Sequence, residues 1–184
     1  HRPELIHAMY PINVHGGGPE FRGGTPALLT VETAQKVYLS YTLTVHNPGG
    51  HSSLPTPDNA IYRLAQGLDR LSSLRFPLRS NSATRGYYGR LATLYAGRTA
   101  DDMRAVAREP SDPTALQRLA ASSVYNNAQL RSTCVPTLLQ GGAAENALPQ
   151  MARATINCRL LPDEDPDQVD AMLKKAVADP AIAI

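Results

Sequence analysis

Residues 36–57 read KVYLSYTLTVHNPGGHSSLPTP, and this stretch decides the fold. From Val37 to Val45, apolar or aromatic residues at odd positions alternate with mostly polar residues at even positions. That period of two predicts a half-buried strand over residues 36–46, with one apolar face and one wet face. The remainder holds three prolines and two glycines. It predicts a stiff turn whose local freedom is concentrated at Gly49-Gly50.

Two amphipathic helices are predicted from the spacing of apolar residues. Over residues 60–71 these residues recur every three or four positions and form one stripe, which is typical of a helix that covers a sheet. Thr56 or Asp58 is expected to cap its first turn. A second helix is predicted to begin at Asp165 as the cap, with Pro166 in the first helical position.

Three further extended segments are predicted. Residues 133–140 are assigned to a sheet edge, because Pro136 cannot donate a hydrogen bond to a neighbouring strand. In residues 150–161 small or apolar side chains alternate with polar ones, which places Arg159 on the wet face. Residues 181–184 are expected to begin a fourth strand.

The segment of about residues 74–131 is predicted to be a helical insertion. One short helix is expected to start near Thr99, and another at Asp112, a cap that is followed by proline. Two glycines weaken any helix over residues 83–95.

The resulting order of strands and helices is βαββαβ with an insertion after the first helix. This order predicts an α+β, ferredoxin-like fold, in which two helices cover one face of a four-stranded antiparallel sheet. Residues 1–29 hold repeated Gly and Pro breaks, so we expect them to be a linker or the tail of a preceding domain. The domain itself is then assigned to residues 30–184.

Composition narrows the possible partners. The formal net charge is only +2 and the basic residues are scattered, so we expect no nucleic-acid partner. No apolar run approaches the roughly 18 residues that span a bilayer, and we expect no membrane partner. Cys134 and Cys158 predict two buried thiols, with a cross-strand disulfide as the alternative. Cytoplasmic and periplasmic or secreted locations therefore both remain open.

Three polar residues are candidates for a site. His51 follows two glycines and precedes two serines, so its imidazole should be displayed, where it can donate to an oxyanion or carry a proton. Arg159 offers a forked donor that suits a carboxylate. Asn146 lies in a predicted turn. Each residue also has an explanation without a function. His51 and Asn146 are ordinary turn residues in that case, and Arg159 is a solvated surface charge.

Three motifs in series resemble a known family. They are Thr44 to Pro55 (TVHNPGGHSSLP), Gly141 to Pro149 (GGAAENALP) and Ile156 to Pro162 (INCRLLP). The chain from about Thr30 to Ile184 is similar to the dimerisation (lid) domain of the zinc-dependent aminoacylase and carboxypeptidase family. That family includes relatives of glutamate carboxypeptidase and succinyl-diaminopimelate desuccinylase.

The resemblance implies a metallopeptidase or amidohydrolase that cleaves amide bonds in peptides or N-acyl amino acids and forms a homodimer through the lid domain. It implies that His51 stabilises the tetrahedral intermediate in the partner's active site. It also implies that Asn146 and Arg159 contact the substrate carboxylate. The family's His-x-Asp and Glu-Glu metal motifs are absent from this sequence. We therefore expect zinc in the parent enzyme, none in this chain, and no activity of the chain alone.

His15 is a doubtful zinc ligand, at a place where the family normally has acidic residues. The alternative function from another class is a stand-alone ferredoxin-like module that binds a small ligand or a partner without catalysis. Substrate specificity and self-association of the isolated chain are left open by the sequence.

Overall fold

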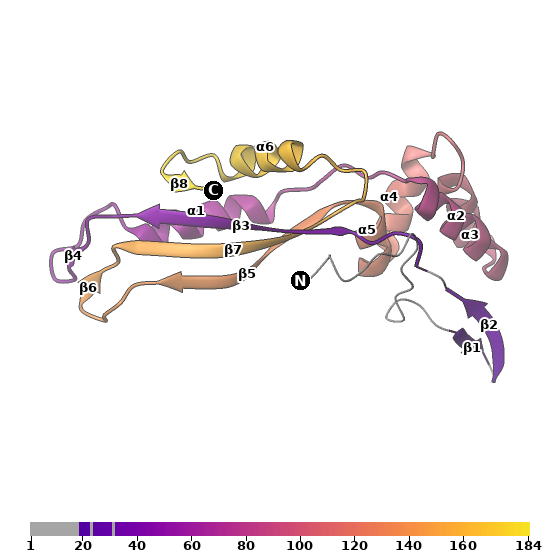
Figure 1. Ribbon diagram of the computed structural model, residues 1–184, viewed down its shortest axis with the longest axis horizontal. Coiled ribbons are helices and arrows are strands. Elements are labelled where there is room, and N and C mark those ends of the chain that lie inside the picture. Colours follow the sequence, from indigo (N-terminus) through magenta and orange to yellow (C-terminus); the bar gives the residue numbers. More distant parts are fainter. Residues whose placement is uncertain (1–18, 23, 31) are drawn as a thin grey trace, which may run out of the picture. The chain divides into compact units, whose positions relative to one another are not determined.

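The computed structural model describes residues 19–22, 24–30 and 32–184, which fall into two units (Figure 1). The first unit, His1–Gln35, contains an antiparallel hairpin of β1 (Pro19–Arg22) and β2 (Thr25–Leu29). This hairpin forms where the sequence led us to expect a linker. The assignment of residues 1–29 to a preceding domain stays a prediction, and His15 lies outside the described residues.

The second unit, Lys36–Ile184, contains the sheet, its covering helices and the insertion. In chain order its elements are β3 (Val37–His46), β4 (Gly50–His51), α1 (Ala60–Ser72), α2 (Ser82–Leu91), the 3-10 turn η2 (Ala92–Leu94), α3 (Gly97–Val106), α4 (Pro113–Ser122), α5 (Val124–Leu130), β5 (Thr133–Gly141), β6 (Ala147–Leu148), β7 (Met151–Leu160), α6 (Pro166–Val177) and β8 (Ile182–Ala183).

The predicted α+β fold class is confirmed by the strand order. The main sheet runs β5-β7-β3-β8, and each neighbouring pair is antiparallel. Along the central pair, Val37 lies opposite Leu160 and His46 lies opposite Met151. β5 is an edge strand as predicted, and its register shifts just after Pro136, the residue that lacks an amide donor.

One face of the sheet packs against α1 and α6 to form the core. Side chains of all three layers belong to a single apolar cluster, and they are fully or almost fully buried: Leu43, Val45, Ala60, Leu64, Leu71, Ala152, Ala154, Ile156, Cys158, Leu160, Val169, Leu173 and Val177. In β7 buried positions alternate with exposed or half-buried ones, so the opposite face carries the polar side chains. The predicted alternation of apolar and polar residues along the strands therefore places the apolar core on one face of the sheet.

The cap of α1 differs from the prediction. Asn59 occupies the cap position, with its side-chain oxygen accepting from the amides of Ile61 and Tyr62. Thr56 instead donates its hydroxyl hydrogen to the Asp58 carbonyl. Both predicted caps lie before the point where the backbone turns into the helix, and Asn supplies the same acceptor chemistry one residue later.

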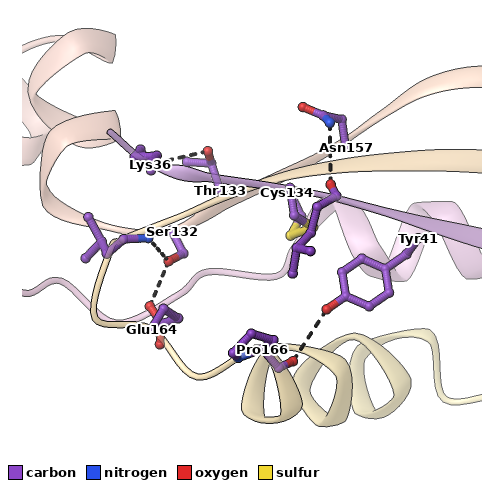
Figure 2. Close-up of a disulfide and its surroundings, with 11 residues drawn as sticks. Lys36, Tyr41, Ser132, Thr133, Cys134, Asn157, Glu164 and Pro166 are labelled. Atoms are coloured by element: carbon purple, nitrogen blue, oxygen red, sulfur yellow. Dashed lines mark hydrogen bonds between the residues drawn. A yellow bond between two sulfur atoms is a disulfide. The ribbon is translucent and has the colours of Figure 1, made fainter. Parts of the chain in front are cut away.

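The two cysteines form a disulfide, so the favoured prediction of two thiols was wrong and the alternative holds. Cys134 of β5 lies directly opposite Cys158 of β7 in the strand register. Figure 2 shows the bond between the two strands. Periodicity within one strand indicates which face a residue occupies but not which residue lies across from it. The sequence therefore offered the disulfide only as the alternative prediction.

The helical insertion is confirmed in type but not in every boundary. α2 forms despite its two glycines, because Asn81 and Thr84 make a reciprocal capping box. A Cβ at Gly89 would lie 3.4 Å from the Ala107 Cβ, an ordinary van der Waals contact, so packing against the end of α3 does not require glycine there. α3 begins at Gly97 rather than near Thr99.

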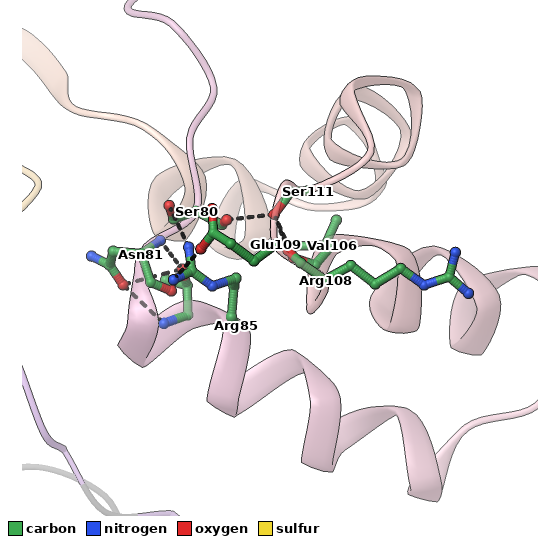
Figure 3. Close-up of polar contacts among 8 residues, drawn as sticks. Ser80, Asn81, Arg85, Val106, Arg108, Glu109 and Ser111 are labelled. Carbon is green, nitrogen blue, oxygen red and sulfur yellow. Dashed lines mark hydrogen bonds and ion pairs between the residues drawn. The ribbon is translucent and has the colours of Figure 1, made fainter.

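Polar contacts hold the insertion together and close its base. The Arg85–Glu109 ion pair and the Ser80–Ser111 hydrogen bond join the start of α2 to the loop after α3 (Figure 3). At the base, the amide of Arg79 donates to the carbonyl of Leu130 at 2.8 Å. The two ends of the insertion therefore lie side by side. Among the described residues, no helix is long and apolar enough to cross a membrane.

Candidate functional site

The structure brings His51 and Asn146 together on a pair of short strands. β4 pairs with β6, so that His51 lies opposite Ala147, and the amide of Ser52 donates to the Asn146 carbonyl at 3.0 Å. This pair of strands extends beyond the ends of β3 and β7 (Figure 1). His51 and Asn146 are both exposed there; the sequence predicted a displayed side chain for His51 and a turn for Asn146.

Two glycines fix the path of the chain into this loop. Gly49 and Gly50 have φ angles of +77° and +150°, a region that side-chain-bearing residues rarely adopt. A Cβ at Gly49 would also lie 2.6 Å from the Gln150 Cγ. The side-chain oxygen of Asn47 accepts from the Gly49 amide at 3.0 Å. His51 is thus carried on a specified turn, even though its side chain is exposed.

Local hydrogen bonds select one tautomer of His51. The backbone amide of Ser53 donates to Nδ1 at 3.2 Å, and the Ser53 hydroxyl oxygen lies 2.8 Å from the same nitrogen. An amide nitrogen can only donate, so Nδ1 is the acceptor in this contact and the imidazole proton resides on Nε2. The arrangement presents an N–H donor on the side of the ring that faces away from the loop's own hydrogen bonds.

Arg159 lies on the wet face of β7 between two cross-strand neighbours. Tyr38 of β3 is opposite on one side, and its ring centroid lies 4.6 Å from the guanidinium carbon. Thr133 of β5 is opposite on the other side. Within the described part of the chain, the Arg159 guanidinium makes no hydrogen bond or ion pair to another residue. Its N–H groups are therefore available to a ligand.

Lys36 occupies the same corner of the sheet. Its ammonium donates to the carbonyls of Ala128 and Arg131, at 2.9 and 2.8 Å. It also donates to the Thr133 hydroxyl at 3.4 Å (Figure 2). Burial and the nearby positive charge of Arg159 lower the pKa of Lys36 to about 8. This corner of the sheet is therefore electropositive. All three hydrogen-bond donors of the Lys36 ammonium have acceptors, whereas the Arg159 guanidinium has no hydrogen-bond partner among the described residues.

The structure does not bring Arg159 close to His51 and Asn146. Arg159 lies eight positions after Met151, the residue at the loop end of β7. At a rise of about 3.3 Å per residue, that separates them by about 26 Å along the strand. A single small substrate cannot span that length, so within one chain the three candidate residues fall into two separate groups, one at each end of the sheet.

Sequence reasoning missed three residues that shape these two places. Ser53 was seen only as part of the loop, although a serine two residues after a turn histidine is at the usual spacing for a local hydrogen bond. Tyr38 was placed on the wet face but not next to Arg159, because that contact depends on strand register. The contacts of Lys36 reach more than ninety residues along the chain, and no local signal predicts them.

The described residues do not offer a metal site. No group of three or more His, Cys, Asp or Glu residues lies close enough to hold a metal ion in residues 19–22, 24–30 and 32–184. Both cysteines are committed to the disulfide, which removes them as thiolate ligands. The residues present therefore do not fit a zinc centre, and no catalytic step is assigned to a metal held by this part of the chain.

The four-stranded sheet and the loop that carries His51 are features of one protein family. The chain belongs to the peptidase dimerisation domain family of the M20 peptidases, which it matches over residues 33–183. The expected family resemblance is confirmed.

Two curated relatives are similar to it across most of its length. The mouse N-fatty-acyl-amino acid synthase/hydrolase PM20D1 is 28% identical over 156 residues, covering 84% of this chain and 30% of that protein. The probable carboxypeptidase S-like 2 of Dictyostelium discoideum is 26% identical, covering 90% of this chain and 31% of that protein. The chain thus spans less than a third of either relative.

A solved structure also resembles the fold. It is the M20 family metallo-carboxypeptidase Sso-CP2 from Sulfolobus solfataricus, with a TM-score of 0.49 and 20% identity. The likeness covers 78% of this chain and 35% of that one.

Proposed function

We propose that this chain is the lid and dimerisation domain of a zinc-dependent metallopeptidase or amidohydrolase that cleaves amide bonds in peptides or N-acyl amino acids. The metal centre belongs to a catalytic part outside the described residues. The domain supplies His51 to the developing oxyanion of the tetrahedral intermediate, and Asn146 and Arg159 to the substrate carboxylate. The observation that carries the proposal is the exposed His51 ring on a glycine turn, with its Nδ1 accepting from the Ser53 amide so that Nε2 is left to donate.

The partner that we propose is a second copy of the same chain, joined through β5. This edge strand exposes three large apolar side chains, Val135, Leu138 and Leu139. Exposed apolar edge strands are unusual in a protein that stays alone, because their free backbone groups accept another strand. Membership of a dimerisation domain family supports the same choice of occupant.

Antiparallel pairing of two β5 strands would unite the two halves of the site. A twofold axis reverses the direction of the partner's sheet. The loop with His51 in one protomer then lies toward the end of the partner's sheet that carries Arg159. Within one chain, His51 and Arg159 are separated by about 26 Å along β7, too far to act on one substrate. In the dimer, each substrate would meet His51 of one copy and Arg159 of the other.

A substitution tests the oxyanion role in the enzyme that carries this domain. His51→Ala should lower kcat by about 100-fold to 1,000-fold, the usual effect of losing one oxyanion donor. His46→Ala is the matched control, since His46 is exposed at the end of β3 but lies before the glycine turn. A kcat for His51→Ala within a few-fold of the control would remove the proposed role.

Subunit mixing tests whether the two halves come from different copies. His51→Ala and Arg159→Ala enzymes are each expected to be nearly inactive. After unfolding and refolding together in equal amounts, the mixed dimers contain one site with both native residues, and about a quarter of wild-type activity should return for a twofold dimer. No recovery, with mixed dimers shown by mass spectrometry, would mean that both residues act within one copy.

A further inference from the structure

Arg159 is held against an aromatic ring rather than extended into solvent. Its guanidinium carbon lies 4.6 Å from the centre of the Tyr38 ring. The Ser40 hydroxyl donates to the Tyr38 hydroxyl oxygen at 3.3 Å, which keeps the ring along the wet face of β3. Stacking of this kind restricts a side chain that otherwise samples many rotamers. The guanidinium therefore lies over the ring, a contact that uses none of its hydrogen-bonding capacity.

The surrounding polar groups do not compete for those N–H edges. Lys36 uses the carbonyls of Ala128 and Arg131 and the hydroxyl of Thr133, which are the acceptors between α5 and the start of β5. The ion pairs formed among the described residues leave Arg159 out. Arg159 thus has an aromatic neighbour and, among the described residues, no hydrogen-bond or ion-pair partner.

We propose that Tyr38 is a positioning residue for Arg159: its ring fixes the plane of the guanidinium so that two parallel N–H groups meet the substrate carboxylate. This inference rests on the proposed role of Arg159 in binding that carboxylate. A bidentate pair depends on the two planar groups lying in register. Tyr38 thus reduces the conformational entropy that the Arg159 side chain loses when the substrate binds. It does so without touching the substrate itself.

The test is steady-state kinetics of the enzyme that carries this domain, with an N-acyl amino acid as substrate. Tyr38→Leu should raise KM about twofold to fivefold, the range expected for an exposed cation–π contact, and leave kcat unchanged. Tyr38→Phe keeps the ring but loses the Ser40 hydrogen bond, so its KM should stay closer to the wild-type value than that of Tyr38→Leu. Because Tyr38 is 58% exposed, neither change should unfold the domain, and circular dichroism checks this.

A second substrate separates positioning from a general structural effect. With the carboxamide analogue, which has no carboxylate, wild type and Tyr38→Leu should give the same kcat/KM. An equal loss for both substrates, or an unchanged KM with the carboxylate, would overturn the role of Tyr38. The Arg159→Ala variant distinguishes failure of this inference from failure of the proposed function. If Arg159→Ala does not raise KM for the carboxylate substrate, the proposed function of Arg159 is wrong. If Arg159→Ala raises that KM and Tyr38→Leu leaves it unchanged, only the present inference about Tyr38 fails.

Discussion

Removal of the Cys134–Cys158 disulfide should cost this domain a large part of its stability. The bond joins residues 24 apart in the sequence. In the chain-entropy treatment, a closed loop of about that length stabilises the fold by about 3.5 kcal/mol at 25 °C, because the unfolded chain loses conformations. For a chain of this size, each kcal/mol corresponds to about 2 to 4 °C in Tm, so reduction should lower Tm by about 7 to 14 °C.

The measurement is equilibrium unfolding in urea, with and without a phosphine reductant. A Cys134→Ala, Cys158→Ala double variant is the control, since it lacks the cross-link under both conditions and should not respond to the reductant. Thiol titration of the unfolded, unreduced protein should find no reactive cysteine. A loss below about 1 kcal/mol on reduction of the wild type, well under the loop-closure figure, would refute the reasoning. Two free thiols would refute the bond itself.

Two further predictions concern a helix cap and a buried amine. Asn59→Ala removes the acceptor for two amides at the start of α1 and should cost about 1 kcal/mol in urea unfolding, whereas Asn59→Asp should cost much less; equal losses would contradict the capping role. Lys36 has a pKa of about 8 in the folded protein and about 10.4 in the unfolded chain. Between these two pH values the unfolded chain binds more protons than the folded one. The free energy of unfolding should therefore rise with pH in this range. Lys36→Met should abolish that rise while the exposed control Lys175→Met keeps it, and a rise that persists in Lys36→Met would assign it to another group.

The fold was largely predictable because its signals are local. The alternation in β3 and β7 and the apolar stripes of α1 and α6 each indicate one buried face, and the order βαββαβ leaves few ways to join those faces. The glycine signal in α2 failed because the capping box of Asn81 and Thr84 closes the first turn of that helix.

The site was predictable only in part. Glycine next to His51 signalled a displayed imidazole, and alternation placed Arg159 on the wet face. The contacts that give these residues their chemistry, Ser53 with His51 and Tyr38 with Arg159, depend on side-chain geometry and on strand register. Neither property is encoded in the spacing of residues along one strand. The same limit left the disulfide as an alternative rather than the favoured prediction.

The hydrogen bond between Arg79 and Leu130 has a consequence for how this domain can change over time. The chain leaves the sheet layer and returns to it at almost the same place, and the apolar cluster under the sheet contains no residue from α2 to α5. The helices α2 to α4 can therefore be lengthened or exchanged with little effect on the strands that carry His51 and Arg159, as long as the Ala128 and Arg131 carbonyls that bind Lys36 stay in place. The loops between these helices are natural points for fusing a foreign module.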